Sequence, residues 1–72
     1  VNEVVINLNS SFELKGDLMV YDCLGKLIFS KRLNANHIAF ENVDVTSWNS
    51  GVYHVVFTSD GGLIQKPLHI VK

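Results

Sequence analysis

The most constraining feature of this chain is the run WNSGVYHVVF, residues 48–57, in which a tight loop leads directly into a strand. Ser50 and Gly51 close the loop, and Tyr53 stands near the start of the apolar run. In small β-sandwiches, a tyrosine at the entry of a late strand folds back and bonds to the preceding corner. We therefore expect Tyr53 to form such a corner, with Trp48 covering the core beneath it.

Short strands separated by regular turn signals account for the rest of the chain, and no segment shows a helical period of useful length. Strands are predicted over residues 4–8, 18–21, 26–33, 37–43, 52–58 and 63–71. This pattern predicts an all-β fold, an immunoglobulin-like antiparallel β-sandwich of six to seven short strands. Residues 1–72 form one domain with a small core, because a chain of this length buries only roughly 60 per cent of its unfolded surface.

The strands are separated by turns with recognisable chemistry. The run DCLG, residues 22–25, begins with aspartate and ends with glycine, which is typical of a type I turn in which Gly25 adopts a left-handed conformation. Residues 60–62, Asp-Gly-Gly, are expected to form a hairpin turn, because glycine tolerates positive φ angles. Residues 44–49 are expected to form one turn of 3₁₀ or α structure.

Alternation along the last two strands predicts which side chains face the core. The predicted inward residues are Tyr53, Val55, Phe57, Ile64, Leu68 and Ile70. Three phenylalanines are also assigned to the core: Phe12, Phe29 and Phe40. Pro67 cannot donate a ladder hydrogen bond, so its strand is expected to lie at a sheet edge or to break there.

Composition excludes several classes of partner. Six basic residues against seven acidic residues give a formal net charge of -1, which offers no electrostatic footprint for nucleic acid or an anionic membrane surface. No window approaches the roughly 20 apolar residues that a membrane-spanning helix needs, so no membrane insertion is expected. A single cysteine, Cys23, cannot form an internal disulfide, and no surrounding motif makes it a nucleophile.

Catalytic or metal chemistry is not indicated. If Gly61 and Gly62 form a two-residue turn, His54 and His69 lie directly opposite each other, but two ligands without a third make a poor site. A solvated pair is therefore the preferred interpretation, and no metal or cofactor is expected. No Gly-rich phosphate loop precedes a helix, and no Ser-His-Asp order suits so small a chain, so we predict that it is not an enzyme.

From Gly16 onward the chain resembles the C-terminal sorting domains of type IX secretion (Por secretion system) cargo proteins. Those domains carry a strand ending in Asp-x-x-Gly-Lys or Asp-x-x-Gly-Arg, then Ser-Gly-x-Tyr entering a strand, then a basic C-terminus. This sequence supplies VYDCLGK, SGVYHV and IVK in that order. The residues that match the family motif are Gly16, Asp22, Gly25, Lys26, Ser50, Gly51 and Tyr53.

The chain departs from the family pattern at both ends. Family members usually begin with a Pro-rich strand, whereas this chain opens VNEVVINLN, so we expect it to come from a longer protein and to lack the first strand. One sheet edge would then be unpaired, and unpaired edges favour a homodimer. The family also carries a lysine near the end of the last strand, whereas Pro67 and Leu68 follow Lys66 here, which leaves a role for Lys66 in recognition open.

The resemblance implies a non-catalytic signal that directs a cargo protein from the periplasm through the outer membrane to the cell surface or beyond. Its partners would be the outer-membrane type IX translocon and a sortase-like signal peptidase that removes the domain afterwards. In this interpretation the translocon recognises the terminal residues Val71 and Lys72, because an accessible chain end can dock without a pocket.

A second interpretation is a structural immunoglobulin- or fibronectin-like spacer, or a carbohydrate-binding module, of a secreted enzyme. Fold alone does not separate these functions. A carbohydrate-binding module would carry exposed aromatic residues in a row, whereas the phenylalanines here are assigned to the core. A sorting signal must end its protein and a spacer can lie anywhere, so position in the parent chain distinguishes the two.

Overall fold

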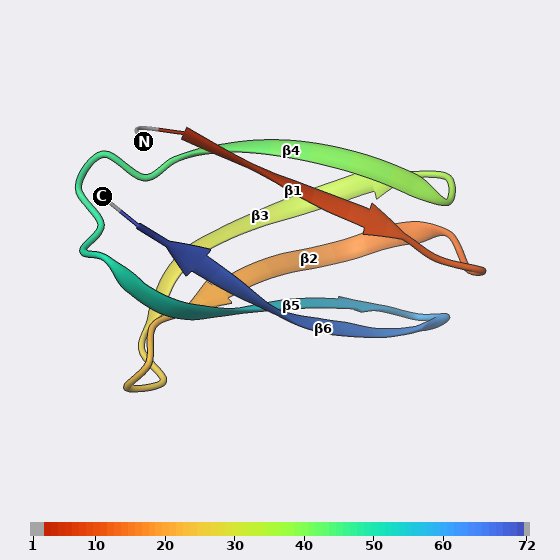
Figure 1. Ribbon diagram of the computed structural model, residues 1–72. Helices are drawn as coiled ribbons and strands as arrows, with labels where there is room; N and C mark the ends of the chain where they lie inside the picture. Colours follow the sequence, from red (N-terminus) through yellow and green to blue (C-terminus); the bar gives the residue numbers. More distant parts are fainter. Residues whose placement is uncertain (1–2, 72) are drawn as a thin grey trace.

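The computed structural model describes residues 3–71 and contains strands and no helix over that range (Figure 1). The strands are β1 (Glu3–Asn9), β2 (Leu14–Tyr21), β3 (Leu27–Ala35), β4 (Ile38–Asp44), β5 (Gly51–Ser59) and β6 (Gly62–Ile70). β1 pairs with β4 in one sheet, the other four form a second sheet in the order β3-β2-β5-β6, and all pairs are antiparallel. The predicted antiparallel sandwich is confirmed, with six strands. Over residues 3–71 no helix is long and apolar enough to cross a membrane.

The strand order is that of an immunoglobulin-like sandwich. In that fold strands A, B and E share one sheet, and strands C, F and G share the other. β1 and β4 occupy the positions of B and E, while β2, β5 and β6 occupy those of C, F and G, with β3 beside β2. Among residues 3–71 no strand occupies the position of A, so the edge of β1 that does not face β4 is unpaired.

The core lies between the two sheets and is apolar throughout. Its buried side chains are Ile6, Leu8, Leu14, Leu18, Val20, Leu33, Val43, Val45, Tyr53, Val55, Phe57 and Ile70. The predicted inward row is confirmed, since its two remaining members, Ile64 and Leu68, pack against this cluster. Phe12 and Phe29 also pack against it, as expected.

Phe40 is not a core residue, and its assignment to the core was wrong. Its side chain is 69% exposed, whereas Val43 is buried and Ala39 packs against the core. Because side chains alternate along a strand, β4 turns either Phe40 or Val43 inward. In the structure, the row of β4 side chains that contains Val43 faces the core.

β2 starts earlier than predicted, and its added part includes Gly16. The strand begins at Leu14 rather than residue 18 and contains Gly16, a residue type that usually weakens strands. A Cβ atom at Gly16 would lie 1.9 Å from the backbone oxygen of Thr58 on β5. The glycine is therefore required by the close approach of a neighbouring backbone.

The segment between β4 and β5 contains one turn closed by an i→i+3 hydrogen bond, the bonding of a single 3₁₀-type turn, as expected for residues 44–49. β4 continues to Asp44, whose Oδ1 atom accepts hydrogen bonds from the backbone and the hydroxyl of Thr46. The amide of Trp48 donates to the carbonyl of Val45 at 3.0 Å. The side chain of Asp44 thus supports this turn by bonding locally to the residue two positions further on.

The β5–β6 turn also differs from its predicted form. Ser59 pairs with Gly62, so Asp60 and Gly61 form the turn and His54 and His69 are not opposite each other. Neither Gly61 nor Gly62 has a positive φ. A Cβ atom at Gly62 would lie 2.6 Å from the ring of Phe12, so contact with this ring, and not turn geometry, requires glycine there. β6 is an edge strand, as Pro67 predicted.

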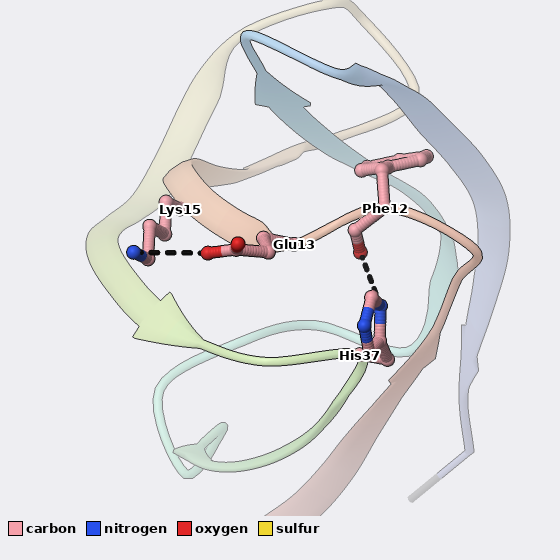
Figure 2. Close-up of polar contacts among 4 residues, drawn as sticks. All are labelled: Phe12, Glu13, Lys15 and His37. Atoms are coloured by element: carbon pink, nitrogen blue, oxygen red, sulfur yellow. Dashed lines mark hydrogen bonds and ion pairs between the residues drawn. The ribbon is translucent and has the colours of Figure 1, made fainter.

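At the end of the sandwich that holds this turn, polar contacts join the β1–β2 connection to the β3–β4 turn (Figure 2). The carbonyl of Phe12 accepts a hydrogen bond from the Ser10 hydroxyl and lies 3.2 Å from Nδ1 of His37. Lys15 forms an ion pair with Glu13 at 2.9 Å, and its hydrogen bond and positive charge lower the pKa of the Glu13 carboxyl. This pair is exposed, so it adds little to stability.

Both outer strands of the larger sheet carry a lysine that contacts the smaller sheet. On β3, Lys31 forms an ion pair with Glu41 of β4. On β6, the ammonium of Lys66 donates to the backbone carbonyl of Asn7 on β1. Lysines at such positions are one of the devices that keep edge strands from pairing with other chains. The structure thus gives Lys66 a contact within the fold.

Candidate functional site

The β2–β3 turn is stabilised by Asp22. Its Oδ1 atom accepts hydrogen bonds from the amides of Leu24 and Lys26, each at 2.9 Å. The amide of Gly25 donates to the carbonyl of Asp22, and Gly25 has a φ of 83°. This left-handed conformation favours glycine, so the predicted turn and the predicted role of Gly25 are confirmed.

The tyrosine corner predicted at the start of β5 is also present. The hydroxyl of Tyr53 donates to the backbone carbonyl of Asn49 at 2.6 Å, and the side chain is only 7% exposed. The ring of Trp48 covers it, with the two ring centroids 5.1 Å apart. Such a hydrogen bond contributes about 1 kcal/mol and holds the corner against the core.

Most residues of the predicted motif lie at one end of the sandwich. Strand register places Tyr21, at the end of β2, beside His54, and it places Gly51 beside Ile70 at the end of β6. In Figure 1 this end is on the left, where the β2–β3 turn, the segment between β4 and β5, and the end of β6 are seen. The predicted residues at this end are Asp22, Gly25, Lys26, Ser50, Gly51, Tyr53 and Val71.

An open groove lies between the turn and the corner. Its volume is about 450 Å³. The residues that line it include Asp22, Lys26, Leu27, Trp48, Asn49 and Tyr53. The groove therefore joins the two motif segments, VYDCLGK and SGVYHV, which are far apart in the sequence.

Of the remaining predicted residues, Gly16 and Val71 do not line the groove. Gly16 lies at the other end of β2, beside Ser59, where its role is close strand packing. Val71 is 77% exposed and follows β6, at the same end as the groove. Lys72 lies outside the described residues.

Sequence reasoning identified Lys26 and Tyr53 but not the groove that they share. It also missed Leu24, which stands at the tip of the turn with 89% of its side chain exposed. An aliphatic residue inside an Asp-x-x-Gly turn was the available signal, because polar residues usually occupy such positions.

The structure offers no arrangement for metal chemistry within residues 3–71, where no group of three or more His, Cys, Asp or Glu side chains comes together. His54 pairs with Pro67, and His69 pairs with Val52, so the two histidines are diagonal neighbours. Cys23 is free and exposed in the β2–β3 turn. Asp17 contacts Arg32 at 3.4 Å.

The profile of one protein family, described as the secretion system C-terminal sorting domain, matches residues 1–71. The chain belongs to this family. No curated protein and no solved structure matches it. The resemblance expected from Gly16 onward is confirmed, and it also covers the first fifteen residues, which the motifs did not reach.

Membership makes this chain a type IX secretion sorting domain. A sorting domain acts with the secretion machinery and accompanies a secreted cargo to the cell surface or beyond. Its family is one of signals and not of catalysts. The groove and the exposed Val71 after β6 are therefore candidate surfaces for recognition.

Proposed function

We propose that this sorting domain carries a cargo protein from the periplasm to the outer-membrane type IX translocon, without catalytic activity of its own, and that a sortase-like signal peptidase then removes it. The family match over residues 1–71 carries this proposal. The shape of the domain supports it, because most of the motif residues lie at one end of the sandwich, beside the exposed Val71. The translocon recognises this end, including Val71 and Lys72. We further propose that the chain is one domain that receives its first strand from upstream.

Export of a fusion protein separates the sorting function from the spacer interpretation, because only a sorting signal should bring the reporter to the cell surface. We expect this domain, joined with its upstream strand to the C-terminus of a periplasmic reporter, to bring the reporter to the surface of a bacterium that has the type IX machinery. A strain without the translocon is the control and should retain the reporter in the periplasm. Surface labelling and fractionation measure the result. A reporter that stays periplasmic in both strains would reject the sorting function and favour a spacer.

The unpaired edge of β1 is the proposed surface for a homodimer. The amide of Ser10 donates to the carbonyl of His37. Every second residue before Ser10, starting with Leu8, therefore forms its backbone hydrogen bonds with β4. The residues between these, such as Asn7, direct their backbone N–H and C=O groups to the free edge. Lys66 covers the Asn7 carbonyl, so its contact opposes pairing there.

We expect sedimentation equilibrium to detect dimers at millimolar concentration, and more of them for Lys66→Ala, because this change uncovers the Asn7 carbonyl. Lys31→Ala is the matched control, since it removes the lysine on the other outer strand and leaves the edge of β1 unchanged. Monomers alone for all three proteins would reject the dimer.

A further inference from the structure

Among residues 3–71, one basic side chain beside the groove has no carboxylate or carbonyl partner. Four of the five lysine and arginine side chains in residues 3–71 contact a carboxylate or a carbonyl: Lys15, Lys31, Arg32 and Lys66. Lys26 makes no such side-chain contact within that part of the chain, yet it lines the groove. The nearby Asp22 uses Oδ1 to accept two backbone hydrogen bonds of the turn, and it forms no ion pair with Lys26.

The groove around Lys26 is accessible, and polar and apolar side chains line it together. Its apolar lining residues include Trp48, Tyr53 and Leu27, of which Leu27 is half exposed. Leu24 projects from the same turn as Lys26 and is almost fully exposed. Exposed apolar residues that adjoin a groove mark protein interaction sites.

We infer that this groove binds a peptide segment of a partner protein that presents a carboxylate to Lys26 and aliphatic side chains to Leu27 and Trp48. The inference deepens the proposed function and rests on it, since the partner is then a component of the secretion machinery. Charge complementarity selects an acidic segment, because the ammonium of Lys26 gains a charge-assisted hydrogen bond when a carboxylate enters. Asp22 also lines the groove, but its Oδ1 atom is engaged by two amides of the turn. The exposed Leu24 and Leu27 favour a peptide with aliphatic side chains. An acidic sugar could stack on Trp48 instead, and glucuronate is the probe that tests it.

Export of the reporter fusion tests the role of Lys26. Lys26→Glu is expected to reduce surface delivery by at least about tenfold, because it replaces attraction by repulsion, whereas Lys26→Arg keeps most of it. Lys15→Glu is the matched control, since it makes the same change of charge at an exposed site at the other end of the sandwich, and it should be exported like the intact domain. Equal export of Lys26→Glu and the intact fusion would overturn the inference. Thermal melting of each variant verifies folding.

Binding in solution gives an answer that does not depend on export. The probes are the peptide acetyl-Leu-Asp-Leu-amide, its Asn counterpart and glucuronate, each titrated into the isotope-labelled chain and followed by nuclear magnetic resonance. We expect the Asp peptide to shift the signals of residues 26–28 and the Trp48 indole, with shifts several-fold smaller for the Asn peptide and for Lys26→Glu. Equal shifts with both peptides, no shifts, or shifts with glucuronate alone would overturn the inference. If the intact fusion is not exported, the proposed function fails, and this titration alone decides what the groove binds.

Discussion

Gly16→Ala is expected to lower the free energy of unfolding by about 3 kcal/mol, a large share of the stability of so small a domain. The added methyl group would lie 1.9 Å from the backbone oxygen of Thr58, and backbone in the middle of a sheet cannot move aside without breaking the β2–β5 ladder. Denaturation in urea, followed by Trp48 fluorescence, measures the change.

Gly51→Ala is the matched control for this experiment. A Cβ atom at Gly51 meets no atom within 4 Å, although its φ of 157° disfavours other residues, so a loss of only about 1 kcal/mol is expected. Equal losses for the two variants would show that close packing is not the reason for Gly16. A stable Gly16→Ala domain that fails in export would instead place Gly16 in recognition.

Removal of Val71 and Lys72 is expected to abolish export and to leave the fold intact. β6 ends at Ile70, which pairs with Gly51, so the truncation keeps the whole β5–β6 ladder. Val71 is largely exposed and lies beside the proposed recognition end, so its loss removes contact surface for a partner without opening the core.

Reporter fusions with the intact and the shortened domain measure this effect, and thermal melting of both shows whether the fold is retained. Replacement of the two terminal residues by two serines is the control for chain length, and it should fail in export as the truncation does. Surface delivery of the shortened fusion at the level of the intact one would contradict recognition through the chain end. Failure of the truncation together with normal export of the serine variant would show that length, and not side-chain chemistry, is recognised.

Features that depend on short segments, such as turns, the tyrosine corner and strand alternation, could be predicted from the sequence. The turn at Asp22 depends on a side chain that bonds to amides two and four residues further along, and Gly25 provides the conformation that this turn needs. The corner at Tyr53 likewise joins residues only four positions apart. Period-two alternation identified all six strands, and the apolar rows of β5 and β6 were assigned to the correct face. These features are encoded locally because every atom that decides them belongs to a short segment.

Choices between equivalent local patterns were decided by the tertiary structure. β4 carries one row with Ile38 and Phe40 and another with Glu41 and Val43, and hydrophobicity alone favours the first. The structure turns the second inward, where Glu41 meets Lys31 of β3. The register of a strand within its sheet determines which row faces the core, and this register depends on partners distant in sequence.

The sequence by itself therefore determined the fold class, the turn at Asp22, the corner and the family motif of this domain. Only the tertiary structure showed that Gly16 and Gly62 are glycines because Thr58 and Phe12 approach them, and that Lys26 and Trp48 share one groove. Turns and alternation follow from bonds and angles within a few residues, whereas close approach and grooves arise where segments far apart in the chain are packed together. No local pattern specifies which distant residues will meet.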